Sequence, residues 1–245
     1  MEIGHVYIQS INGVPEDEAF YKAWDGFRKR RVDCTLVTAA AIESGNLPLH
    51  VSTLVAGGVR TVESAMRQVG LRVPVANNLP DQLSGYFGRD IRKTTLGEVR
   101  AKWRDENAEP CFLRPLERNK LFGAIALFDT DDLLSLKSHM DDTPVIVSEY
   151  VLFESEWRVF VVDGKIIGMS HYQGDYFVYP DPDTIKQALQ SYVNAPAGYG
   201  IDFGVLSDGR TVLVEANDGY SLGSYNLNSV DYSRVLEARW LELAA

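Results

Sequence analysis

Two carboxylates and one amide lie close together in a predicted β-hairpin over residues 200–217. Apolar runs flank Asp208-Gly209, a pair that favours a two-residue turn. The register that follows from this turn pairs Asp202 with Glu215, and strand alternation puts Asn217 on the same face. Like charges paired in this way destabilise a sheet, whereas a bound cation turns their repulsion into attraction. Carboxylate and amide oxygens suit Mg²⁺ that is shared with nucleotide phosphates, so the spacing predicts a magnesium site.

The same hairpin has a second interpretation, in which the acids form the solvent-facing side of an edge hairpin. The predicted register also places Leu206 and Leu213 on the acidic face. Apolar side chains there indicate a partly covered surface, which favours a binding site.

Composition limits the classes of protein to which the chain can belong. Its 245 residues are 45% hydrophobic and include four tryptophans, which is enough for one large domain or two small ones. The formal net charge of -10 argues against nucleic acid held through phosphate contacts. The one basic run, residues 28–31, ends a predicted helix, where cations complement the helix dipole.

Cysteines and hydropathy predict the compartment. Cys34 and Cys111 lie in separate apolar runs, which indicates buried free thiols of a reducing compartment. No apolar run reaches transmembrane length, and the first residues lack a basic region followed by an apolar one. We therefore expect a soluble, cytoplasmic protein without a membrane partner.

The order of predicted elements changes after about residue 77. Before this point strands and helices alternate, which predicts a parallel α/β domain over residues 1–85. Its strands are expected at 5–9, 33–37 and 52–56, and its helices at 16–31, 39–44 and 59–69. Hairpins dominate the later part, with strands expected at 111–115, 124–128, 145–151, 157–162 and 165–170, and helices at 129–138, 181–194 and 230–243.

Four segments of the later part, in this order, resemble the ATP-grasp superfamily. They are residues 110–115 (PCFLRP), 147–151 (VSEYV), 156–165 (EWRVFVVDGK) and Asp202 with 214–217 (VEAN). The nearest likeness is to compact members of unassigned substrate that are related to peptide ligases. The resemblance implies an ATP-grasp domain over 86–245 with antiparallel sheets. Its two α+β lobes, about 86–148 and 149–245, would hold ATP between them.

The resemblance also implies a reaction. Most ATP-grasp enzymes phosphorylate a carboxylate with ATP, and an amine or thiol then attacks the acyl phosphate. The products are ADP and phosphate. In the matching positions of this chain, Asp202, Glu215 and Asn217 would bind Mg²⁺.

Arg158 and Lys120 are the candidate catalytic cations. By its position in the family motif, Arg158 would lie on the γ-phosphate or the developing acyl phosphate. A cross-strand ion pair with Glu156 or Glu154 is the alternative for this arginine. Lys120 would close over the phosphates from a flap, residues 117–123, that contains one glycine. The alternative for Lys120 is an ordinary solvated charge.

The resemblance implies nucleotide contacts at the strand that links the lobes. Backbone groups of Tyr150 and Val151 would bind adenine, and Glu149 would orient its amino edge. Glu154 would accept hydrogen bonds from the ribose hydroxyls.

Two further cations are candidates for the phosphates. Arg114 stands where the family usually has lysine, and Lys93 would lie at the entrance between the lobes. For Lys93 a solvated surface charge is again the alternative.

Three functions remain open on these observations. The first is an ATP- and Mg²⁺-dependent ligase that joins a small-molecule or peptide carboxylate to an amine acceptor. The second is a phosphotransferase with a hydroxyl acceptor, for which the unusual Arg114 leaves room. The third is a nucleotide-binding module without turnover, which would account for the glycine-poor flap.

Overall fold

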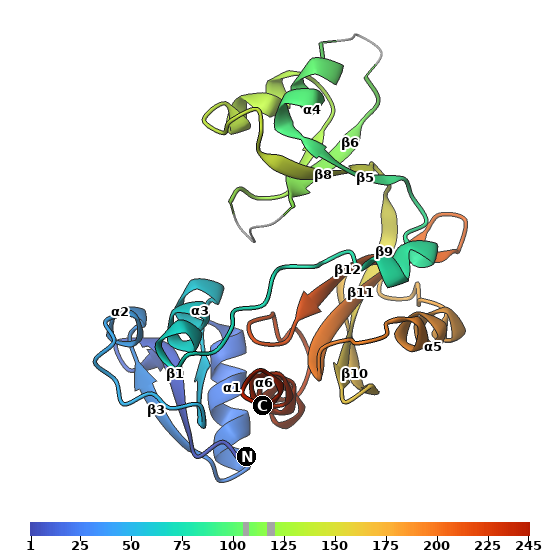
Figure 1. Ribbon diagram of the computed structural model, residues 1–245. Coiled ribbons are helices and arrows are strands. Elements are labelled where there is room, and N and C mark those ends of the chain that lie inside the picture. Colours follow the sequence, from blue (N-terminus) through green and yellow to red (C-terminus); the bar gives the residue numbers. More distant parts are fainter. Residues whose placement is uncertain (105–107, 117–120) are drawn as a thin grey trace.

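The computed structural model describes residues 1–104, 108–116 and 121–245, which form three four-stranded sheets (Figure 1). The N-terminal sheet is parallel over β1 (His5–Ile11), β3 (Asp33–Val37) and β4 (Thr53–Ala56), with β1 in the centre. The short β2 (Val14–Pro15) pairs antiparallel with the end of β1. The predicted parallel α/β arrangement of this part is therefore confirmed.

Helices cover the N-terminal sheet: α1 (Glu18–Lys29), α2 (Ala39–Glu43) and α3 (Val59–Gln68). Asp17 begins α1 by accepting a hydrogen bond from the Phe20 amide over 2.9 Å. The last helix of the chain, α6 (Ser229–Leu243), packs against α1. A Cβ on Gly26 would lie 1.9 Å from the Ser229 carbonyl oxygen, so glycine permits this close crossing.

The middle sheet and its helices form a separate body at the top of Figure 1, which we call the upper lobe. Its antiparallel strands lie in the order β5-β8-β6-β7. Helix α4 and the short 3-10 helix η2 cover one face, with a core that includes Leu96, Val99 and Leu113. The elements are β5 (Ile91–Thr95), α4 (Leu96–Lys102), β6 (Cys111–Pro115), β7 (Ile125–Leu127), η2 (Asp131–Leu136) and β8 (Pro144–Glu149).

The third sheet has the order β10-β9-β11-β12 and is antiparallel throughout. Helix α5 covers one face together with the 3-10 helix η1, around Val159, Ile201 and Phe203. Helix α6 packs on the other face and shares one core with the N-terminal sheet. The elements are η1 (Asp81–Tyr86), β9 (Phe153–Val162), β10 (Lys165–Gly174), α5 (Pro182–Ser191), β11 (Gly198–Leu206) and β12 (Thr211–Asp218). We call this sheet with α5 and α6 the lower lobe.

The β11–β12 hairpin departs from the predicted register at its turn. The Leu206 amide donates to the Arg210 carbonyl oxygen over 2.9 Å, and Val205 pairs with Thr211. The loop therefore holds three residues rather than two. It ends at Gly209, whose φ of 82° is the left-handed conformation that such loops require.

A bulge further along β12 corrects this shift. Phe203 pairs with Leu213 and Asp202 pairs with Glu215, so Val214 is the extra residue. The predicted pairing of the two acids is thus present, although the turn that implied it is not. The expectation that Leu213 lies on the acidic face was wrong, because the bulge reverses strand alternation and Leu213 packs in the core beneath α5.

Two helical predictions were also inexact. The helix expected at 129–138 is the shorter η2, and α4 was not expected at all. Among the residues that the structure describes, no helix has both the length and the apolar character needed to cross a membrane.

Candidate active site

The acidic face of β11 and β12 brings the three predicted metal ligands together. Asn217 Nδ2 donates to Glu215 Oε1 over 2.9 Å and to Asp202 Oδ2 over 3.4 Å. Two carboxylates and an amide on one face are a donor set that fits Mg²⁺. No metal-binding group of three His, Cys, Asp or Glu side chains occurs among the described residues, so the set depends on the amide.

Arg158 forms a bidentate pair with Asp202 from the neighbouring strand. Arg158 Nε lies 2.7 Å from Asp202 Oδ1, and Nη2 lies 2.7 Å from Oδ2. Only 6% of the arginine and 2% of the aspartate side chain are exposed. Burial raises the pKa of Asp202 to about 6, although the hydrogen bonds from Arg158 act to lower it. The alternative ion pairs of Arg158 with Glu156 or Glu154 are not present.

Three further contacts fix the Arg158 guanidinium. Its central carbon lies 4.7 Å from the centre of the Tyr225 ring, and that ring stacks on Tyr172 at 4.9 Å. The Tyr172 hydroxyl donates to Glu156 Oε2 over 2.7 Å. A Cβ on Gly200 would lie 3.1 Å from Arg158 Cδ, so the strand beneath the arginine is open because it carries glycine there.

An ion pair connects the two lobes across this face. Arg114, on β6 of the upper lobe, donates from Nη1 to Glu215 Oε2 over 2.8 Å. Both side chains are largely buried. The proposed phosphate-binding cation and a proposed metal ligand are therefore in direct contact.

Two cavities meet at this ion pair. The first, of about 480 Å³, lies between the lobes and is lined by Glu149, Tyr150, Val151, Glu156 and Asp202, among others. The second, of about 450 Å³, extends to the first turns of α1 and α3 and is lined by Arg158, Asn217 and the loop after β12. Arg114, Ala124 and Glu215 line both cavities. A group in one cavity can therefore approach a group in the other at this junction.

The linker between the lobes runs along the first cavity. Glu149 ends β8, and Tyr150 and Val151 follow it at the cavity wall. The Tyr150 ring packs edge-on against Phe128, with ring centres 4.8 Å apart. Backbone groups of this linker are available to a flat ligand between the lobes.

Glu154 does not line either cavity and is exposed. The carboxylate that lines the first cavity is Glu156, which is 8% exposed. Burial raises the pKa of Glu156, and the Tyr172 hydrogen bond opposes this shift. Glu156 and Arg158 lie two residues apart on one strand, so alternation placed both on one face and was the signal for this residue.

The two candidate lysines are not part of the described site. Lys93 pairs with Ile146 on the cavity-facing side of the upper sheet, but its side chain is 62% exposed and lies 3.8 Å from Asp81. Lys120 lies outside the residues that the structure describes. Sequence reasoning also missed Arg89, a buried cation that lines the first cavity.

A protein-family model described as an ATP-grasp domain, family 2 of its clade, matches residues 86–235. The chain belongs to this ATP-grasp family. The match covers more than half of the chain and includes every proposed ligand of the nucleotide and the metal.

Solved ATP-grasp structures share the fold over the whole chain. The RimK domain protein of Sphaerobacter thermophilus is 16% identical, with a TM-score of 0.59 over 97% of this chain and 99% of its own. The D-alanine–D-alanine ligase of Bacillus anthracis complexed with ATP is 16% identical, with a TM-score of 0.57 over 98% and 96%. D-cycloserine synthetase DcsG is 12% identical, with a TM-score of 0.62 over 98% and 99%. No curated protein matches the chain in sequence.

Proposed function

We propose that the protein is an ATP- and Mg²⁺-dependent ligase that joins a carboxylate to an amine through an acyl phosphate. The observation that carries this proposal is the meeting of two cavities at Arg114 and Glu215. One cavity suits a nucleotide between two lobes, and the other suits a second substrate. The junction contains the cations and acids that phosphoryl transfer needs.

The first cavity is assigned to ATP. Adenine would lie against the linker that follows β8, with hydrogen bonds to the backbone of Tyr150 and Val151. Glu156 takes the ribose role that the sequence suggested for Glu154, because it is the buried carboxylate of this cavity. Arg114 would hold the phosphates at the end where the two cavities meet.

Asp202, Glu215 and Asn217 would hold the magnesium. The ion would supply charge neutralisation for the β- and γ-phosphates. In the structure each carboxylate already contacts an arginine, so the protein balances the charge of this acidic face. Each carboxylate oxygen can accept more than one partner, which leaves lone pairs for a metal.

Arg158 stabilises the transferring phosphoryl group in this proposal. A carboxylate oxygen of the acceptor attacks the γ-phosphorus, the bond to the bridging oxygen breaks, and ADP leaves. The amine nitrogen then attacks the acyl carbon, phosphate leaves with the bonding electrons, and the nitrogen loses a proton. Arg158 lines the second cavity while Asp202 orients it, so its charge faces the site of transfer without rearrangement.

A hydroxylamine trap tests the acyl phosphate without knowledge of the natural amine. The protein is incubated with ATP, Mg²⁺, hydroxylamine and a panel of carboxylates that includes amino acids and short peptides. Carboxylate-dependent hydroxamate and ADP in equal amounts support the proposal. Asp202→Asn should abolish both, whereas Asp208→Asn, in the exposed turn of the same hairpin, should leave both unchanged.

Two outcomes would contradict the ligase. A stable phosphorylated product from a hydroxyl compound, formed without an amine, would indicate a phosphotransferase. ATP binding that persists without Mg²⁺ and in Asp202→Asn, with no ADP from any substrate, would indicate a module without turnover.

A further inference from the structure

The bulge at Val214 presents backbone carbonyl groups that Arg89 binds. Arg89 Nη1 donates to the Leu213 carbonyl oxygen over 2.7 Å, and Nη2 donates to the Val214 carbonyl oxygen over 3.1 Å. Nη1 also donates to the Phe87 carbonyl oxygen over 2.9 Å. A bulge disrupts the regular ladder, so its backbone groups need other partners. One guanidinium supplies them for two successive residues.

Arg89 does this as a buried cation without a carboxylate partner. No Asp or Glu oxygen of the described residues lies within 4.0 Å of its nitrogens. Burial, with a smaller effect of nearby Arg114, lowers the pKa of Arg89 to about 10, so it stays charged at neutral pH. The planar fork of arginine reaches neighbouring acceptors that a single ammonium group does not span.

The backbone before Arg89 permits close contact with β12. Gly88 has a φ of 60°, a conformation that favours glycine. A Cβ at this position would lie 2.2 Å from Val212 Cγ1. The loop therefore runs directly against the strand that carries the bulge.

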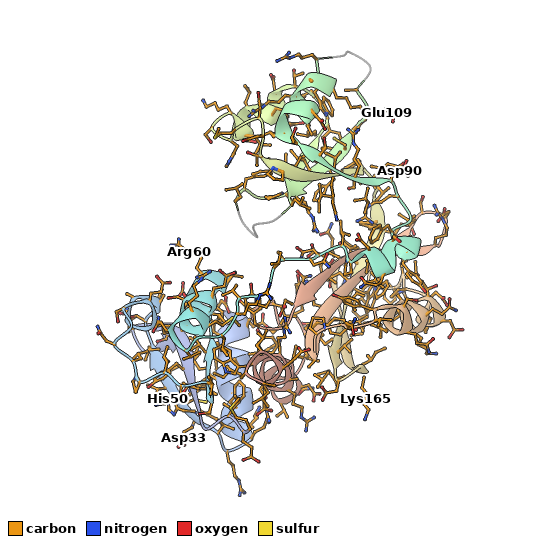
Figure 2. All side chains as sticks on the ribbon, viewed as in Figure 1. Asp33, His50, Arg60, Asp90, Glu109 and Lys165 are labelled. Carbon is orange, nitrogen blue, oxygen red and sulfur yellow. The ribbon has the colours of Figure 1, made fainter. Side chains whose placement is uncertain are left out.

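The next residue connects the same loop to the linker that lines the nucleotide cavity. The Asp90 carbonyl oxygen accepts a hydrogen bond from the Glu149 amide over 2.9 Å. Asp90 is labelled in Figure 2 where the chain enters the upper lobe. Two consecutive residues thus contact the proposed metal-binding strand on one side and the proposed adenine-binding linker on the other.

We propose that Arg89 is a positioning residue, which fixes the β12 bulge and thereby presents Glu215 to the metal of the bound nucleotide. A one-residue slip of β12 would exchange its faces and turn Glu215 toward the core beneath α5. The three carbonyl contacts stabilise the bulged register against that slip. The role of the metal in this inference rests on the proposed function, whereas the role of Arg89 at the bulge does not.

Hydrogen exchange tests the bulge without any ligand. In Arg89→Met, amides of residues 211–218 should exchange at least tenfold faster, while β9 and β10 keep their protection. Arg89→Lys, which retains the charge but not the fork, should fall between this variant and the wild type. Arg210→Met removes an exposed arginine from the same hairpin and should have no effect. Exchange in Arg89→Met within threefold of the wild type would overturn the inference.

Calorimetric titration tests the metal. At saturating ADP, Arg89→Met and Arg89→Lys should bind Mg²⁺ at least tenfold more weakly, while ADP alone binds within threefold of the wild type. Weaker binding of ADP alone with unchanged Mg²⁺ affinity would overturn the inference and make Arg89 a direct nucleotide ligand. A wild-type protein whose ADP binding does not respond to Mg²⁺ would overturn the proposed function, and hydrogen exchange would still judge the role of Arg89 at the bulge.

Discussion

Arg158 and Asp202 bind each other through both nitrogen–oxygen contacts of a buried bidentate pair, each 2.7 Å long. The sequence suggested separate ligands for them, a phosphoryl group for the arginine and a metal ion for the aspartate. The pair shows that one acid can serve both functions, because it orients the cation and keeps free lone pairs. Removing either partner leaves a buried charge without its counterion.

Arg158→Lys should lower kcat by about 100-fold, in the range found for removal of one preorganised donor. Lysine keeps the charge but cannot form both contacts with Asp202 or stack on Tyr225 in the same way. Rates of ADP release under saturating substrates would measure this. Arg234→Lys, at an exposed position on α6, is the control. A rate equal to that of the control would exclude a role for the guanidinium geometry.

Glu156→Gln should weaken ATP binding by about tenfold, which corresponds to a charged hydrogen bond of about 1.4 kcal/mol. Glu154→Gln should not change it, because Glu154 is exposed and lines neither cavity. Dissociation constants for ATP and for 2′-deoxy-ATP separate a ribose contact from a general loss of structure. The reverse ranking of the two variants would restore the original assignment to Glu154.

Gly200→Ala should displace Arg158 without removing any functional group. The new Cβ would lie 2.8 Å from Leu222 Cδ1 and 3.1 Å from Arg158 Cδ. We expect a loss of about 1–3 kcal/mol in the free energy of unfolding and a fall in kcat. Gly85→Ala is the matched control, because no atom lies within 4 Å of its Cβ position. Denaturant unfolding and ADP release together measure both effects, and full activity in Gly200→Ala would contradict the proposed arginine position.

Cys34 should stay protonated and react slowly with thiol reagents at pH 8. Burial raises the pKa of the Cys34 thiol to about 11. Because the folded pKa is raised above its ordinary value of 9.0, this contribution to stability is complete below pH 9 and is lost as the pH rises through 11. Rates of modification of a Cys111→Ala variant, native and unfolded, from pH 7 to 10 would check this. A native rate equal to the unfolded rate would contradict it.

The sequence predicted the acidic pair better than it predicted the hairpin. A two-residue turn gave the right partner for Asp202 because two deviations cancel, a longer loop and a bulge at Val214. Neither is visible in local propensity, since Asp208-Gly209 suits both loop lengths. Leu213 shows the cost, because its face depends on the position of the bulge.

Residues with several open partners were the hardest to assign from sequence. The ion pair of Arg158 was expected within its own strand, but Asp202 on the neighbouring strand is both opposite and buried. Arg89 lies in an apparently ordinary loop, and its acceptors are backbone carbonyls that carry no sequence signature. Side-chain motifs were predictable, and contacts to the main chain were not.

The core that α6 shares with the N-terminal sheet makes one rigid base from the two ends of the chain. The upper lobe has a core of its own and reaches this base through Arg114 and the loop around Arg89. Release of spent nucleotide therefore requires only that this one jaw swing away. The floor on which the second substrate rests can survive many openings undisturbed, ready for the next turnover.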